Sequence, residues 1–215
     1  MFSKTVKKLN DIVLENNFPP MIGSRNYVYA SIAAYECIAA GDSSYQTLSG
    51  QIRHMPPMPK PEAGKKIDYQ LAAMLAFTKV GNAVTFPEGS MMGYYKDLVK
   101  KVDDAGIPGD VLDNTITFSD TIFSAIMKWS KGDNYARTRS ASKYTVTEED
   151  GRWVPTPPAY TSAMEPHWSE IRTLALDSGG ECRPMPPPRY TLKDTASEYF
   201  RCLMQVKHTV DSLTD

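Results

Sequence analysis

The stretch between residues 24 and 41 is apolar on nearly every face that a helix would offer. It reads Ser24-Arg-Asn-Tyr-Val-Tyr-Ala-Ser-Ile-Ala-Ala-Tyr-Glu-Cys-Ile-Ala-Ala-Gly41, with a serine that can cap the first turn and a glycine that can end the last. A helix without a polar face is buried among other helices rather than laid on a surface. We therefore expect a helical bundle with residues 24–41 in its middle.

Other segments repeat apolar residues at helical spacing, which predicts further helices. They cover residues 4–16, 68–84, 87–104, 110–131 and 197–212. Two proline-rich segments, 54–64 and 177–191, are expected to be long loops, and residues 132–165 carry few helical patterns. The sequence predicts an all-α fold, a helical bundle with long proline-rich loops, in a single helical domain over residues 1–215.

Charge and composition exclude several classes of function. The 215 residues carry a formal net charge of -1, and their lysines and arginines are scattered, which argues against nucleic-acid binding. No stretch approaches the ~20 apolar residues of a membrane span, and charges interrupt the apolar positions of residues 1–17, unlike those of a signal peptide. Cys37, Cys182 and Cys202 form no CxxC pair, so neither a disulfide framework nor a zinc site is predicted.

One short segment combines residue types that chemistry can use. Glu165, His167 and Arg172 fall within eight residues, and a short helix can begin there with Pro166 in its first turn. A histidine near a carboxylate and a guanidinium can bind an oxyanion or relay a proton. The alternative is that His167 and Arg172 anchor the loops of the second half onto the helices. Metal-binding patterns such as HExxH and glycine-rich phosphate loops are absent from the sequence, so we expect no metal ligand here.

Five segments, in order along the chain, carry a resemblance to a known family. They are Arg25–Glu36, Ala125–Tyr135, Trp153–Tyr160, Met164–Arg172 and Leu176–Ser178 with the proline loop that follows. Together they resemble the N-terminal region of bacterial vanadium-dependent haloperoxidase-like proteins of the type-2 phosphatidic acid phosphatase superfamily. The resemblance implies an all-helical fold and, for the complete protein, haloperoxidase (oxidoreductase) or phosphatase (phosphoesterase) activity. It also implies a place in the bacterial periplasm or cell envelope.

The chemistry that the resemblance implies depends on motifs that this sequence lacks. Active members hold vanadate, or a substrate phosphate, with a Lys-x6-Arg-Pro motif, a Ser-Gly-His segment and a later Arg-to-His motif, because cationic side chains neutralise a tetrahedral anion. Lys131 and Arg137 are one residue too close for the first motif, and Thr138 replaces its proline. Arg183-Pro184 has Leu176 where the lysine would stand. The resemblance thus implies vanadate for the complete protein, and we expect no cofactor and no catalytic residue in this chain.

We expect this chain to be the N-terminal scaffold portion of such a protein, lacking the C-terminal catalytic bundle and inactive by itself. Its apolar helix faces would then be covered by the missing C-terminal half or by a second copy of the chain. The alternative is a stand-alone helical binding or interaction module without enzymatic activity, in which the proline loops at 56–61 and 184–188 dock partners. The segments present do not distinguish a haloperoxidase from a phosphatase.

Overall fold

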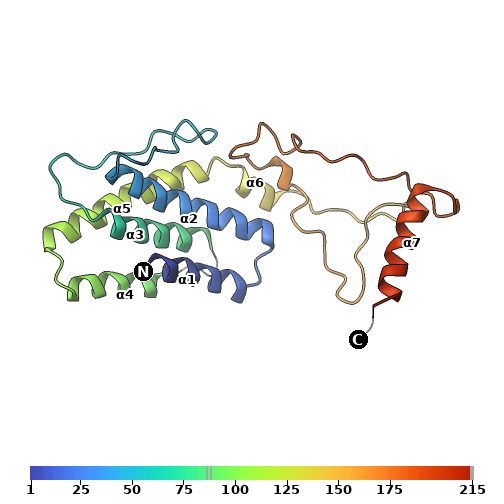
Figure 1. The fold of residues 1–215 in the computed structure, drawn as a ribbon, viewed down its shortest axis with the longest axis horizontal. Coiled ribbons are helices and arrows are strands. Elements are labelled where there is room, and N and C mark those ends of the chain that lie inside the picture. Colours follow the sequence, from blue (N-terminus) through green and yellow to red (C-terminus); the bar gives the residue numbers. More distant parts are fainter. Residues whose placement is uncertain (86, 88, 214–215) are drawn as a thin grey trace. The chain divides into compact units, whose positions relative to one another are not determined.

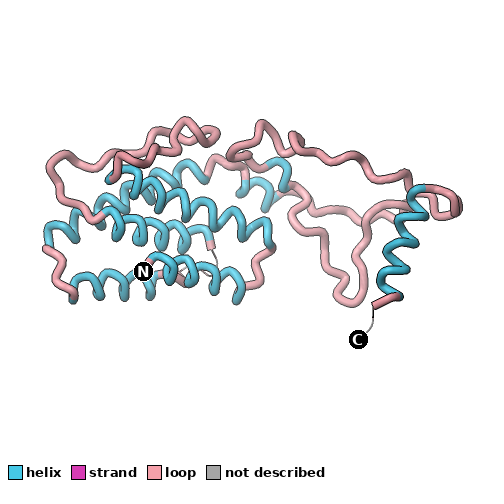
Figure 2. Tube along the Cα trace, viewed as in Figure 1, coloured by secondary structure: helices cyan, strands magenta, loops and turns pink. Residues whose placement is uncertain are grey.

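The computed structural model describes residues 1–85, 87 and 89–213, and its regular elements are helices joined by loops (Figures 1 and 2). In chain order they are α1 (Phe2–Glu15), α2 (Pro20–Gly41), α3 (Tyr69–Val84), α4 (Met92–Asp104), α5 (Gly109–Ser130), α6 (Tyr135–Ser140), a 3-10 turn (Trp168–Glu170) and α7 (Glu198–Asp211). One isolated bridge joins Ser49 and Ile52, and the described residues form no sheet. The prediction of an all-α fold is confirmed. None of the described helices is long and apolar enough to cross a membrane.

Contacts divide the chain into two compact units. The first comprises Met1–Ala141 together with Glu170–Leu176, and the second comprises Ser142–Ser169 together with the residues from Asp177 onward. Every buried side chain of the described residues belongs to the first unit. The expectation of a single domain over residues 1–215 stays a prediction.

Helix α3, rather than α2, lies in the middle of the first unit. It packs against α1, α2, α4 and α5, and Leu71, Leu75 and Phe77 are almost completely buried. Helix α2 packs mainly against α3 and α5, and it leaves Ser31 exposed. Both helices are apolar on nearly every face, so the apolar pattern alone does not tell which of them is central.

Two helices begin at places that differ from the prediction. Helix α2 starts at Pro20 rather than Ser24, because proline lacks an N–H group and its fixed φ suits the first turn of a helix. The helix therefore begins four residues before the serine that was expected to cap it. Helix α4 starts at Met92, later than expected. Phe86 and Glu88, near the predicted start of α4, lie outside the described residues.

Two short elements lie where the sequence showed little helical pattern. Helix α6 has six residues, too few to display apolar periodicity in the sequence. The short helix expected near Glu165 is a single 3-10 turn at Trp168–Glu170.

Helix α7 begins after Ser197, whose hydroxyl accepts a hydrogen bond from the backbone N–H of Phe200 at 3.1 Å, as expected of an N-cap.

The loop after α2 is fastened by a buried carboxylate. Glu36 is 3% exposed; its two oxygens accept hydrogen bonds from the Thr47 hydroxyl and the Leu48 backbone N–H, both at 2.7 Å. A cleft of about 500 Å³ lies between the end of α2 and the proline loop. Its lining includes Glu36, Ala39, Ala40, Pro57, Met58 and Lys60.

The C-terminal end of α2 is close to the start of α3. A Cβ atom added to Gly41 would lie 2.2 Å from the Tyr69 ring, well inside van der Waals contact. The Tyr69 ring also packs edge-on against Phe118, with 5.9 Å between ring centroids. Glycine at position 41 therefore permits the approach of the aromatic ring that links α3 to α5.

We predict that Gly41→Ala lowers the free energy of unfolding by roughly 1–3 kcal/mol, because the added methyl group forces Tyr69 to move. Gly93→Ala in α4 is the matched control, since its Cβ would meet no atom within 4 Å. The control is expected to be neutral or slightly stabilising because alanine has the higher helix propensity. Urea unfolding measures both; equal changes in the two variants would contradict the packing argument.

Candidate functional site: a buried arginine–aspartate network

A buried carboxylate stands between α5 and α6. Asp133 is 1% exposed and follows the last turn of α5. Its Oδ1 accepts a hydrogen bond from the backbone N–H of Tyr135 at 2.9 Å, at the start of α6. Asn134 between them has φ 75°, in the left-handed region that asparagine tolerates better than most residues. This sharp turn directs the carboxylate inward, where it needs partners.

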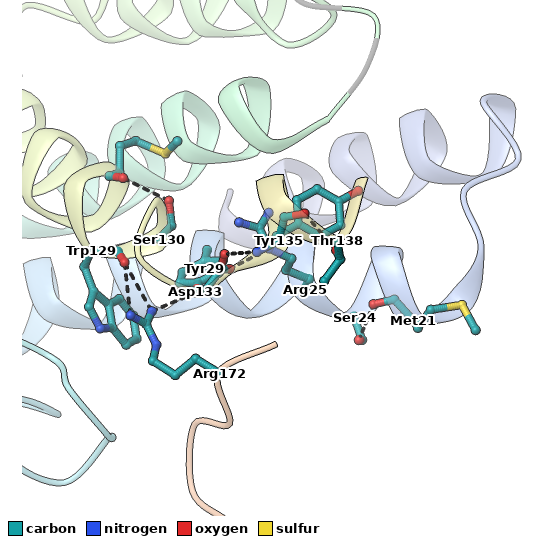
Figure 3. Close-up of polar contacts among 11 residues, drawn as sticks. Met21, Ser24, Arg25, Tyr29, Trp129, Ser130, Asp133, Tyr135, Thr138 and Arg172 are labelled. Carbon is teal, nitrogen blue, oxygen red and sulfur yellow. Dashed lines mark hydrogen bonds and ion pairs between the residues drawn. The ribbon is translucent and has the colours of Figure 1, made fainter. Parts of the chain in front are cut away.

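Two side chains one turn apart on α2 supply these partners (Figure 3). Arg25 Nε donates to Asp133 Oδ2 at 2.7 Å, and the Tyr29 hydroxyl donates to the same oxygen at 2.9 Å. The side chains of Arg25 and Asp133 are 11% and 2% exposed, so solvent screens this ion pair little. The i, i+4 spacing places Arg25 and Tyr29 on one face of α2.

Arg172 joins the network from a distant part of the sequence. Its Nη2 donates to the Tyr29 hydroxyl at 3.0 Å, and Nη1 and Nη2 each donate to the Trp129 carbonyl at 3.2 Å. Its backbone N–H donates to the Asp133 carbonyl at 2.9 Å. The Tyr29 hydroxyl thus accepts from Arg172 and donates to Asp133. These bonds fix residues 170–176 on α2 and on the end of α5.

Aromatic rings enclose both guanidinium groups. Arg25 Cζ lies 4.9 Å from the centroid of the Tyr29 ring and 4.3 Å from that of Tyr135. Arg172 Cζ lies 4.6 Å from the centroid of the Trp129 ring. The Tyr29 and Trp129 rings meet edge to face, with 5.3 Å between centroids. Such contacts stabilise a cation away from water and add to the hydrogen bonds.

Burial, together with the neighbouring Asp133 carboxylate, raises the pKa of Tyr29 to about 12, although Arg172 and Arg25 act in the opposite direction. The phenol therefore remains protonated at neutral pH. A protonated hydroxyl can donate to Asp133 and accept from Arg172 at the same time. Tyr29 is thus a fixed link in the network rather than a base.

The network does not fit vanadate or another tetrahedral oxyanion. The Asp133 carboxylate already binds Arg25 Nε, and the Trp129 carbonyl and Tyr29 hydroxyl bind both terminal nitrogens of Arg172. An anion placed there would also be repelled by the Asp133 charge. Within residues 1–85, 87 and 89–213, no group of three or more His, Cys, Asp and Glu side chains could hold a metal ion. The network is a structural anchor.

The three residues singled out in the sequence fall in different units. Arg172 belongs to the first unit, and Glu165 and His167 belong to the second. His167 Nε2 donates to the Ser142 carbonyl at 2.8 Å, and the Glu165 carbonyl accepts from the Trp168 N–H at 3.0 Å. The structure gives the local contacts of each residue but does not test whether the three act together. A cluster of Glu165, His167 and Arg172 that binds an anion or anchors the loops stays a prediction.

Sequence reasoning missed Arg25, Tyr29 and Asp133, although a signal for one of them was present. Arg25 and Glu36 are the only charged residues between positions 24 and 41. A charge within an apolar helix needs a buried partner, and both side chains have one. The identity of the partner was not readable, because Asp133 is 108 positions from Arg25.

The chain resembles a solved structure over its whole length. No protein-family model matches the chain, and no curated protein matches it. Its structure is similar to that of a vanadium-dependent peroxidase, in line with the resemblance that the five sequence segments carry. One solved structure that it resembles is a bacterial vanadium-dependent iodoperoxidase, with a TM-score of 0.92 and 31% sequence identity. The match covers 100% of this chain and 52% of the iodoperoxidase chain, so this sequence spans about half the length of that protein.

We predict that Asp133→Ala lowers the free energy of unfolding by about 3–5 kcal/mol, because it leaves the Arg25 guanidinium buried without a counter-ion. Adding Arg25→Met should recover much of that loss, since no unpaired charge then remains buried. Urea unfolding of the wild type, both single variants and the double variant measures the coupling. Strictly additive losses would show that the two side chains do not depend on each other.

A second prediction concerns how stability changes at alkaline pH. Because the pKa of Tyr29 is raised in the folded protein, the stability that its hydroxyl contributes is fully present below pH 10, the ordinary pKa of tyrosine. That stability is lost as the pH rises to about 12. Over that interval the stability difference between wild type and Tyr29→Phe should narrow by roughly 2 kcal/mol. Urea unfolding at pH 9 to 12 tests this, since the other tyrosines cancel between the two proteins. A difference that stays constant would contradict it.

Proposed function

We propose that this chain is the scaffold portion of a vanadium-dependent haloperoxidase-like enzyme and that the anion-binding residues belong to the portion that this sequence does not include. The observation that carries the proposal is the match itself: all of this chain aligns with about half of an iodoperoxidase at a TM-score of 0.92. A likeness of this extent concerns the whole arrangement of the chain and not one bundle of helices.

The contacts that the two partly buried arginines make support the scaffold role. Arg25 and Arg172 are the kind of side chain that holds vanadate or phosphate, yet both are bound to groups of this chain. The Lys-x6-Arg-Pro and Ser-Gly-His motifs are absent from the sequence. We therefore assign this chain the role of holding the catalytic portion in position. Its network fixes α2, α5 and residues 170–176 as one rigid support.

The activity assay that tests the proposal uses vanadate, hydrogen peroxide and iodide. The 215-residue chain alone should show no peroxidation. A chimera should be active when this chain replaces the matching half of the iodoperoxidase and is joined to the half that the match leaves out. Activity from the isolated chain, or a folded chimera without peroxidase activity, would contradict the proposal.

The cleft beside the proline loop favours a second candidate function, a helical binding module without enzymatic activity. The cleft has a volume of about 500 Å³, within the range of small-molecule and side-chain pockets. Five of the ten residues that line it are alanine or proline, and the buried Glu36 is also among the ten. This candidate and the scaffold role give opposite results in the chimera assay, because a binding module does not complete an enzyme.

A further inference from the structure

Helix α7 carries an apolar stripe that faces solvent. Leu203, Val206 and Val210 recur at intervals of three and four residues, and Leu213 follows just beyond the helix end. The four side chains are 42%, 64%, 59% and 73% exposed. Such spacing aligns side chains on one face of a helix, and we call these four residues the α7 stripe.

The second unit does not use the α7 stripe for its own packing. The least exposed apolar side chains of α7 are Tyr199, Phe200 and Met204, and Tyr199 packs against Tyr190 with 5.0 Å between ring centroids. Met204 follows Leu203 directly and so points about 100° away from it around the helix. Tyr199 lies one turn before Leu203 on the face of the stripe, so its contact with Tyr190 covers only the start of that face and leaves Val206, Val210 and Leu213 exposed.

The second unit lacks the buried side chains that normally stabilise an ordered fold. None of the described residues in the second unit is buried. Ordering a residue costs about 1–2 kcal/mol of backbone entropy, which burial of apolar side chains normally offsets. A row of exposed aliphatic side chains on an ordered helix marks a surface that another element covers.

We propose that the α7 stripe docks an amphipathic helix from the half of the haloperoxidase-like protein that this sequence does not include. This inference rests on the proposed function. The match to the iodoperoxidase covers α7 with the rest of the chain, and that protein has almost as much chain again. In the proposed whole protein, that further chain supplies the helix that covers the stripe.

The stripe also indicates what its occupant must look like. Intervals of three and four residues suit a neighbouring helix that crosses at about 20° and has apolar residues at the same spacing. A second copy of the chain is the weaker occupant. Two helices of 14 residues would bury much less than the roughly 1,000 Å² of a specific interface.

Hydrogen exchange of the α7 amides tests the docking independently of activity. In the chimera these amides should exchange about tenfold more slowly, or slower still, than in the isolated chain, because a docked helix opens less often. Val206→Glu in the chimera should restore fast exchange. Gln205→Glu is the matched control: it adds the same charge on the adjacent polar side of α7 and should leave the protection intact.

Three results separate the possible outcomes. Equal exchange of α7 in the chimera and in the isolated chain would overturn the docking proposal. A dimer of the isolated chain that Val206→Glu separates would also overturn it, because the occupant would then be a second copy; light scattering measures this. A chimera that protects α7 in the predicted way and yet lacks peroxidase activity would support the docking and contradict the proposed function alone.

Discussion

The Asp133 carboxylate is a charge that the first unit can bury only if several distant segments are in place together. It accepts hydrogen bonds from Arg25, Tyr29 and the Tyr135 backbone, and its own backbone carbonyl holds Arg172. A buried ion pair adds little net stability compared with apolar packing, but breaking it is costly because an uncompensated charge remains. The network therefore favours one arrangement of α2, α5, α6 and residues 170–176 over near alternatives, while the apolar core supplies most of the stability.

Helical pattern predicted much of the fold, and its failures have physical causes. The long helices show apolar periodicity, so their existence was readable. The start of α2 was misplaced because Ser24 is a good N-cap residue, although Pro20 also suits a first turn. Helix α6 was missed because six residues show no period, and the side chain that fixes its first turn belongs to Asp133. Residues 171–176 have no regular structure, and their position depends on Tyr29, 143 positions from Arg172.

The candidate site was readable only in fragments. Arg172 was singled out for its sequence neighbours Glu165 and His167, whereas its contacts in the first unit are with Tyr29 and Trp129. Arg172 and these two partners come from three of the five segments that resemble the haloperoxidase-like family: Arg25–Glu36, Ala125–Tyr135 and Met164–Arg172. The segments that carry the resemblance are therefore the ones that the network joins.

The two units differ in how many of their own apolar side chains they bury. In the first unit, α3 is enclosed by four helices, and Arg25 and Asp133 of the network form an ion pair within the unit. In the second unit no described side chain is buried, and α7 keeps Val206 and Val210 more than half exposed. The first unit therefore has its own buried core, whereas the second unit leaves apolar side chains of α7 exposed. The proposed scaffold role would use this asymmetry, because a support must be rigid before it receives another element.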